Sequence, residues 1–261
     1  MDIADKIIVV TGGGSGIGAA LCRRFAADGA AAVVVVDLHA DAAAAVADGI
    51  GGVAEALDVC DAAAVASLVE RTLERFGRID LFCSNAGMAT GVELDDPDDM
   101  WHKAYDLHVM SHVYASRAVL PGMLERGSGY LLNTASAAGL LTSPGDAPYS
   151  VTKHGAVALA EWLAVTYGCR GIGVSVLCPM GVATPLLMDP LAVGNAGAQA
   201  VADSGPILAP EQVAEAVVAG LAAQRFLILP HPEVATYWAQ KAADPERWLA
   251  GLRRLVARSS T

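Results

Sequence analysis

The sequence predicts an α/β protein with a doubly wound, parallel β-sheet of about seven strands flanked by helices. Short β-branched runs alternate along the chain with longer Ala-rich segments of helical length. This alternation of strand and helix is typical of a parallel sheet. The apolar runs are continuous rather than alternating, as expected for strands covered by helices on both faces. A Gly-rich turn joins the first strand directly to the first helix.

Strands are expected at residues 7–11, 32–37, 53–57, 81–84, 130–134, 174–178 and 226–229. Helices are expected at residues 17–28, 41–48, 62–76, 99–125, 150–167 and 211–223. Neither a linker nor an internal repeat interrupts this order, so residues 1–261 are expected to form one domain. Residues 183–210 lack a regular pattern, and a loop of that length is typically a lid or binding loop. A helical tail is expected at about residues 232–261.

Composition narrows the class of protein further. Hydrophobic residues make up 54% of the 261 residues, too many for a disordered chain. No apolar run approaches the roughly 20 residues of a membrane-spanning helix, so no membrane partner is expected. The net charge of −11 argues against a nucleic-acid partner. The five cysteines include no Cys-x-x-Cys pair and the N-terminus has no signal-peptide architecture, which together indicate a cytoplasmic protein with reduced thiols.

Residues 11–18 form the Gly-rich turn, with the sequence Thr-Gly-Gly-Gly-Ser-Gly-Ile-Gly. Glycine lets the backbone approach a pyrophosphate, which the positive N-terminus of the following helix would bind. Asp37 ends the second strand about twenty residues later, where a carboxylate would accept hydrogen bonds from an adenosine ribose. A 2′-phosphate would meet like charge there, and no Lys or Arg follows closely. The pattern therefore predicts a Rossmann-type site that binds NAD rather than NADP.

Tyr149 and Lys153 are four residues apart at the start of a predicted helix, so both side chains lie on one helical face. A nearby ammonium favours the phenolate form of a tyrosine. Lowering the phenol pKa from near 10 to about 7 requires roughly 4 kcal/mol, much of which Lys153 and a positively charged nicotinamide could supply. This spacing alone is more common in surface helix pairs, so the neighbouring residues must show whether the pair is catalytic. Ser136 follows a strand and is therefore expected at the carboxyl edge of the sheet, where ligands bind.

Together these residues resemble the short-chain dehydrogenase/reductase family over essentially the whole chain. The cofactor turn of that family is matched by Thr11, Gly12, Gly16 and Gly18. The other matching motifs are Asp58-Val59, Asn85-Ala86-Gly87, the set of Ser136, Tyr149 and Lys153, and Pro179-Met180-Gly181-Val182-Ala183-Thr184.

The resemblance implies a role for each motif. Tyr149 would be the general acid in reduction and the base in oxidation. Lys153 would bind the nicotinamide ribose and lower the phenol pKa, and Ser136 would hold the reacting oxygen. Val182 and Thr184 would touch the nicotinamide carboxamide. The full set expected to bind the cofactor is Thr11, Gly12, Gly14, Ser15, Gly16, Ile17, Gly18, Asp37, Leu38, Asp58, Val59, Asn85, Ala86, Gly87, Tyr149, Lys153, Pro179, Gly181, Val182 and Thr184.

One position departs from the family pattern. Relatives usually carry an Asn that helps a water-mediated proton relay from the Lys, whereas this chain has His108. Two interpretations are open. His108 carries or supports the relay, which would add a titration between about pH 5 and 8, or it is a buried helix histidine and another group holds the water. His112 lies four residues further on, but no third ligand is evident and no metal site is expected.

The family commonly forms tetramers through the long helices before and after the fifth strand. The helix after Tyr149 is apolar on nearly every face, which independently favours a subunit interface and hence a homotetramer.

The substrate pocket is expected to be apolar. Its expected residues carry no basic group and are Met88, Leu140, Leu141, Met180, Leu186 and Leu187. This lining favours a neutral, lipophilic secondary alcohol or its ketone. The leading hypothesis is an NAD-dependent alcohol dehydrogenase, with an NADH-dependent ketone reductase as the same chemistry in reverse. The alternative is a catalytically weak NAD-binding regulator or scaffold, against which the intact Ser136, Tyr149 and Lys153 argue.

Overall fold

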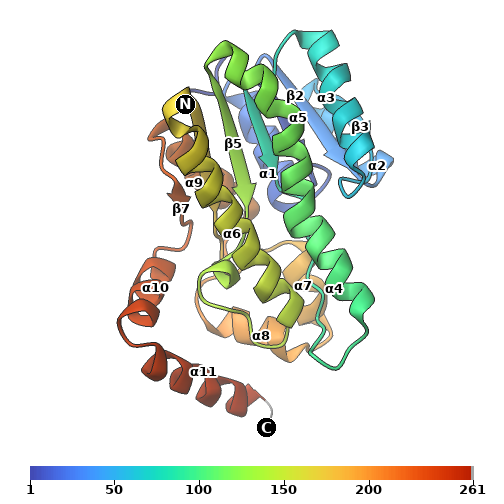
Figure 1. Ribbon diagram of the computed structural model, residues 1–261. Helices are drawn as coiled ribbons and strands as arrows, with labels where there is room; N and C mark the ends of the chain where they lie inside the picture. The colour runs from blue at the N-terminus through green and yellow to red at the C-terminus, as the bar shows by residue number, and fades with distance from the viewer. Residues whose placement is uncertain (260–261) are drawn as a thin grey trace.

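The computed structural model describes residues 1–259, in which seven strands form one parallel sheet (Figure 1). The spatial order is β3-β2-β1-β4-β5-β6-β7, and every neighbouring pair is parallel. The strands are β1 (Ile7–Thr11), β2 (Ala32–Asp37), β3 (Val53–Ala56), β4 (Leu81–Ser84), β5 (Gly129–Thr134), β6 (Ile172–Leu177) and β7 (Leu227–Ile228). The predicted fold class is confirmed.

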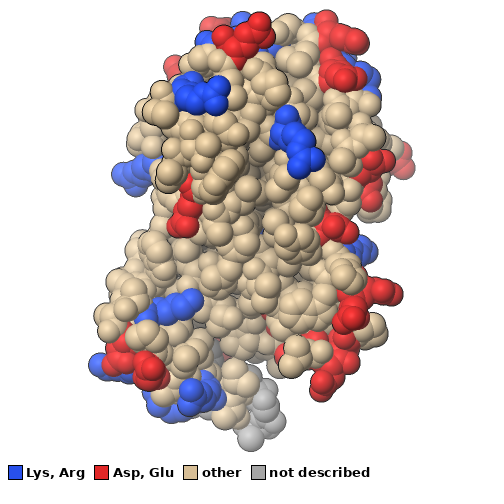
Figure 2. Space-filling model, viewed as in Figure 1, with Lys and Arg blue, Asp and Glu red and all other residues tan. Residues whose placement is uncertain are grey.

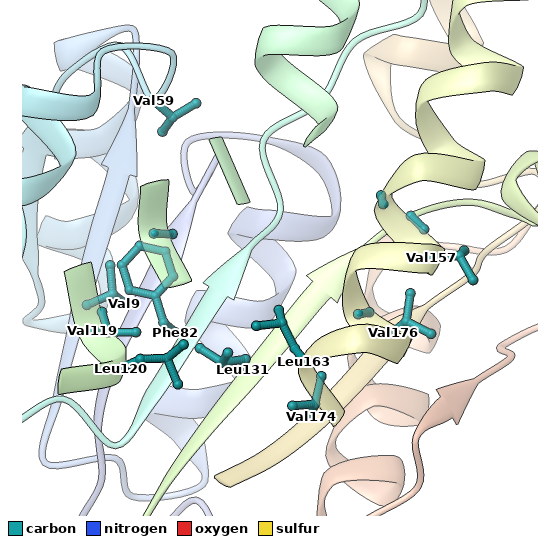
Figure 3. Packing of buried hydrophobic residues seen from close by; sticks show 14 of the residues in the cluster. Val9, Val59, Phe82, Val119, Leu120, Leu131, Val157, Leu163, Val174 and Val176 are labelled. Atoms are coloured by element: carbon teal, nitrogen blue, oxygen red, sulfur yellow. The ribbon is translucent and has the colours of Figure 1, made fainter. Parts of the chain in front are cut away.

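Helices cover both faces of this sheet. On one face lie α1 (Gly16–Ala27), α2 (Ala40–Ile50) and α9 (Pro210–Ala222), and on the other lie α3 (Ala62–Phe76), α5 (Ser111–Arg126) and α6 (Ala147–Tyr167). Val9 of β1 packs into the layer with α3 and α5, whereas its neighbours Ile8 and Val10 pack into the layer with α1 and α9. Figure 3 shows Phe82 and Leu131 in the first of these layers. Burial on both faces explains why the strands read as continuous apolar runs.

The long helix expected at 99–125 is divided by a π-helical turn. It consists of α4 (Asp98–Tyr105), the π turn η1 (Asp106–Met110) and α5. A π turn inserts an extra residue into the helix and is often found at functional sites. His108 lies in this turn and is fully buried, so the irregular backbone coincides with the position that departs from the family pattern.

Helix α6 begins three residues earlier than expected. Asp146 caps its N-terminus by accepting a hydrogen bond of 3.1 Å from the backbone N–H of Tyr149. Pro148 is compatible with this start because the first turn of a helix needs no intrahelical N–H donor. Tyr149 therefore lies within the first turn of α6, directly above the carboxyl edge of the sheet.

The segment expected to lack regular structure contains two short helices, α7 (Pro185–Ala192) and α8 (Ala196–Asp203). Each has eight residues, too few for an amphipathic period to stand out in the sequence. The expected tail forms α10 (Glu233–Ala243) and α11 (Pro245–Ser259), and its last two positions, 260–261, lie outside the described residues. No helix within residues 1–259 is long and apolar enough to cross a membrane.

Candidate active site

A cleft of about 1780 Å³ opens at the carboxyl edge of the sheet. The strand order reverses between β1 and β4, and ligands of open α/β sheets bind at such a switch point. The cleft continues from the Gly-rich turn after β1, past the loops after β4 and β5, to α7, α8, α10 and α11. These helices surround the lower end of the molecule in Figure 1.

Gly12 and Gly18 of the Gly-rich turn are packed too closely to carry a side chain. Gly12 has a φ of +63°, and a Cβ there would lie 2.9 Å from the Ala86 Cα atom. A Cβ on Gly18 would lie 2.0 Å from the carbonyl oxygen of Gly12, so α1 packs directly against the turn. Ser15 is the N-cap of α1 but makes no side-chain capping bond, and Ser15, Gly16 and Ile17 line the cleft. The uncapped helix N-terminus fits a pyrophosphate, which its free N–H groups would bind.

Asp37 is held rigidly at the end of β2. Its Oδ2 atom accepts a hydrogen bond of 3.0 Å from the Gly14 N–H, and its Oδ1 atom accepts one of 3.1 Å from the His39 N–H. Asp37, Leu38, Asp58 and Val59 all line this end of the cleft. A fixed carboxylate beside the Gly-rich turn fits the hydroxyls of an adenosine ribose.

Thr11 and Asn85 join the ends of three strands. The Thr11 Oγ1 atom accepts hydrogen bonds from the N–H groups of Asn85 (2.9 Å) and Ala86 (3.1 Å). The Asn85 amide donates to the Thr11 carbonyl at 3.0 Å and accepts from the Thr134 hydroxyl at 3.2 Å. Thr11 is buried and lies outside the lining of the cleft, so its side chain holds the neighbouring loops rather than facing the cleft.

Ser136, Tyr149 and Lys153 are brought together at the centre of the cleft and all three line it. The Lys153 Nζ atom lies 5.5 Å from the centroid of the Tyr149 ring and donates a hydrogen bond of 3.1 Å to the Thr134 carbonyl. The Ser136 side chain hydrogen-bonds with Tyr149, and its Oγ atom accepts a bond of 3.1 Å from the Ala138 N–H. The three groups come from the loop after β5 and from the first turns of α6.

Burial controls the ionisation of this pair. It raises the pKa of Tyr149 to about 12, an effect that the hydrogen bond with Ser136 opposes and the charge of Asp146 reinforces. It also lowers the pKa of Lys153 to about 8. The phenol pKa of the protein by itself thus lies above its usual value, and the expectation of a pKa near 7, which relied on Lys153 together with a positively charged nicotinamide, stays a prediction. Removal of water from the site disfavours the charged phenolate and is the largest cause of this rise in pKa.

His108 is fixed by two hydrogen bonds on opposite sides of its ring. Its Nε2 atom accepts from the Met88 N–H at 3.1 Å, which assigns the proton to Nδ1, 2.8 Å from the Thr152 hydroxyl. The ring also meets Tyr149 edge to face, with centroids 5.5 Å apart. Burial and the nearby Lys153 lower the pKa of His108 to about 2. This contradicts the titration between pH 5 and 8 that the relay hypothesis required and agrees with a neutral, buried helix histidine.

His112 shows no metal-site geometry. It is fully buried on α5, where its ring lies beside the side chain of Asn133. Within residues 1–259, no group of three His, Cys, Asp or Glu side chains could hold a metal ion.

Most of the expected site residues line the cleft, and five of them do not. Leu140 is buried, and its carbonyl oxygen accepts a 2.6 Å hydrogen bond from Lys241. The Gly181 carbonyl oxygen faces the ring of His231 at 3.0 Å. The five residues outside the lining of the cleft are Thr11, Gly14, His108, Leu140 and Gly181.

Several residues at the site were missed in the sequence. Asp146 is a buried carboxylate that contacts both the Tyr149 helix and the loop after β4, and its position before Ala-Pro-Tyr is a recognisable N-cap signal. His231 accepts a bond of 3.1 Å from the Met180 N–H and so holds the 179–184 segment. Tyr237, Trp248 and Leu252 bring the tail to the cleft. Neither His231 nor the tail contacts have a local signal, since both join segments far apart in the chain.

Comparison with known proteins identifies the family. The model described as short chain dehydrogenase matches residues 6–192. The 1-deoxy-11-beta-hydroxypentalenate dehydrogenase of Streptomyces avermitilis is 33% identical over 259 residues, with 96% of this chain and 93% of that protein covered. The chain therefore belongs to the short-chain dehydrogenase/reductase family of oxidoreductases, as the sequence motifs indicated.

Other relatives show the range of this family. The meso-2,3-butanediol dehydrogenase of Serratia marcescens is 34% identical over 188 residues, covering 70% of this chain and 74% of that protein. A short-chain dehydrogenase/reductase from Burkholderia phymatum, solved in complex with NAD, superposes with a TM-score of 0.85 at 29% identity, covering 94% of this chain and 96% of that one.

Proposed function

We propose that the chain is a single-domain, NAD(H)-dependent oxidoreductase that interconverts a neutral, lipophilic secondary alcohol and its ketone. The observation that carries this proposal is the convergence of Ser136, Tyr149 and Lys153 in one cleft with the Gly-rich turn and Asp37. The alcohol dehydrogenases among the relatives support the reaction class.

The proposed mechanism assigns one task to each side chain. A bound oxidised nicotinamide would supply a hydride acceptor and a positive charge. Tyr149 takes the hydroxyl proton of the alcohol on oxidation and returns it to the carbonyl oxygen on reduction. Ser136 donates a hydrogen bond to the same oxygen. Lys153 lies close to the Tyr149 ring, and its charge, together with that of the oxidised nicotinamide, would favour the phenolate. Both charges act strongly because water is excluded from the site.

NAD is favoured over NADP by the charge at the adenosine end of the cleft. Asp37 is fixed there by the Gly14 and His39 N–H groups, and the next residue is the exposed Leu38 rather than a basic residue. A carboxylate repels a 2′-phosphate but accepts hydrogen bonds from a ribose hydroxyl. The NAD complex of the Burkholderia phymatum relative is consistent with this choice.

The apolar side of the cleft favours a neutral substrate. Of the expected pocket residues, those that line the cleft are Met88, Leu141, Met180, Leu186 and Leu187. Trp248 and Leu252 of α11 add to this apolar lining. A carboxylate or phosphate would lose water against these side chains, none of which is basic.

The proposal is tested by following NADH absorbance with a panel of neutral secondary alcohols, with Tyr149→Phe as the matched variant. We expect turnover by the wild type, and a loss of at least about a hundredfold in Tyr149→Phe with NAD binding retained. Turnover confined to phosphorylated or carboxylate substrates would refute the substrate class. Tight NAD binding without any turnover would favour the regulator or scaffold.

We also propose a cytoplasmic homotetramer. The outer face of α6 exposes Val151 (58%), Trp162 (57%) and Val165 (84%), and Figure 2 shows few charged side chains over α5 and α6. Large exposed apolar surfaces of this kind are typical of protein interfaces. All five cysteines are free thiols, in keeping with a reducing compartment. Sedimentation equilibrium of the wild type and Val165→Glu tests the assembly, since a monomeric wild type would refute it.

A further inference from the structure

We propose that Asp146 is a positioning residue that holds the loop of residues 88–91 against the first turn of the Tyr149 helix. This inference rests on the proposed function, since it concerns the same acid–base group. It adds a residue that belongs to none of the motifs by which the chain resembles its family.

The Asp146 carboxylate acts as a clamp, because it accepts hydrogen bonds both from the helix of Tyr149 and from the loop of residues 88–91. One oxygen, Oδ1, accepts from the Tyr149 N–H at 3.1 Å and from the Thr90 hydroxyl. The other, Oδ2, accepts from the Thr90 N–H at 2.8 Å and the Gly91 N–H at 2.9 Å. The Ala147 N–H adds a bond of 3.1 Å to the Val92 carbonyl beside the clamp. Four donors on one buried carboxylate are more than helix capping requires, since an N-cap needs one or two.

The clamped loop forms one wall of the reaction site. It follows Asn85-Ala86-Gly87, and Met88, Thr90 and Gly91 all line the cleft that Tyr149 also lines. The Met88 N–H is already fixed by His108, so Asp146 holds the far end of the same short loop. The loop and the helix have no covalent connection nearby, being 55 residues or more apart in the chain at these bonds. Asp146 therefore accepts three hydrogen bonds that hold this wall at the N-terminus of α6.

Several neighbouring groups, Asp146 among them, influence the pKa of the Tyr149 phenol. The ring of His108 on η1 and the ammonium of Lys153 on α6 each lie 5.5 Å from the centroid of the Tyr149 ring, and Ser136 after β5, Cys178 after β6 and Asp146 also act on the phenol. Of these, Asp146 and Cys178 raise the phenol pKa and Ser136 lowers it. His108 is neutral because burial lowers its pKa to about 2. Asp146 is thus an acidic side chain that contacts the Tyr149 backbone and raises the phenol pKa, so its removal favours the phenolate.

The test compares Asp146→Ser with a matched capping variant, Asp61→Ser. Serine still caps α6 through the Tyr149 N–H but is too short to reach the loop. Asp61 caps α3 through the N–H groups of Ala63 and Ala64 and lies outside the cleft. In Asp146→Ser we expect faster amide hydrogen exchange in the peptide covering residues 88–92, a fall in kcat of about tenfold, and an acidic limb of kcat/KM shifted to lower pH. Asp61→Ser should show none of these changes.

Asp146→Asn keeps the volume of the side chain and provides a second variant should Asp146→Ser fail to fold. Its carbonyl oxygen can still accept from the Tyr149 N–H and the Thr90 hydroxyl, whereas its NH2 group cannot accept from the Thr90 and Gly91 N–H groups, so its effects should be intermediate. Unchanged exchange at residues 88–92, or a kcat/KM profile that does not move, would overturn the proposal. Hydrogen exchange is measured without substrate, so this outcome is distinct from failure of the proposed function, which wild-type inactivity would reveal.

Discussion

The Lys153 ammonium donates a hydrogen bond of 3.1 Å to the carbonyl oxygen of Thr134 and is 3% exposed. Thr134 ends β5, so the ammonium is fixed above the carboxyl edge of the sheet rather than paired with a carboxylate. A buried charge without a counter-ion is costly to the folded state. Burial of this charge lowers the pKa of Lys153 and is expected to reduce the free energy of unfolding.

Lys153→Met is expected to stabilise the fold while it abolishes turnover. The pKa of Lys153 falls from 10.5 to about 8 on folding, which corresponds to a penalty on the order of 3 kcal/mol below pH 8. The unfolded chain binds more protons than the folded one between pH 8 and 10.5, so the penalty disappears as the pH rises through that window. Urea unfolding at pH 7 and pH 10.5 should show an advantage of Lys153→Met at pH 7 only. The exposed Lys103→Met serves as the control, and an equal advantage at both pH values would contradict the argument.

His108→Asn, which restores the residue usual in the family, is expected to leave the pH–rate profile unchanged between pH 5 and 8. The pKa of His108 is lowered to about 2, so the ring is neutral throughout this range. Both ring nitrogens are also engaged, with the Met88 N–H and the Thr152 hydroxyl. Steady-state kcat/KM across this range checks the prediction. The disappearance of a limb near pH 6 in the variant would restore the relay hypothesis.

The strands could be predicted closely because burial on both faces gives them an unbroken apolar pattern. Residues 7–11, 32–37 and 81–84 were predicted with the observed bounds. The π turn at Asp106–Met110 has no local sequence signal, and it brings the ring of His108 against Tyr149 of α6. Helices α7 and α8 were missed because eight residues are too few for an amphipathic period to stand out.

The candidate site could be predicted only where its functional residues lie close together in the sequence. Tyr149 and Lys153 are one helical turn apart, so their proximity follows from spacing alone. The rise in the pKa of Tyr149 that burial causes could not be predicted, because burial of the phenol depends on segments distant in sequence. The contacts of His231 with residues 180, 181 and 206 are likewise long-range, and the sequence near position 231 does not predict them.

Gly18→Ala is expected to abolish cofactor binding and to destabilise the fold. A Cβ at this position would lie 2.0 Å from the Gly12 carbonyl oxygen and 2.7 Å from the Asn85 amide, so α1 would have to move away from the turn. Gly49→Ala is the matched control: it lies in α2 with no atom within 4 Å of the added Cβ and should stabilise the fold by up to about 1 kcal/mol. Thermal unfolding and calorimetric titration with NAD measure both effects. Unimpaired NAD binding by Gly18→Ala would refute the assignment of the turn to the cofactor.

Asp37→Ala combined with Leu38→Arg is expected to shift preference from NADH to NADPH. The first change removes the carboxylate that the Gly14 and His39 N–H groups hold at the adenosine end of the cleft. The second places a guanidinium at a side chain that is now 63% exposed, where it can pair with a 2′-phosphate. We expect the ratio of kcat/KM for NADPH to that for NADH to rise on the order of 100-fold, equivalent to about 2.7 kcal/mol. Asp41→Ala, an exposed acidic position in the first turn of α2 outside the cleft, controls for the change in net charge. A double variant that retains the wild-type ratio would show that Asp37 does not face the ribose.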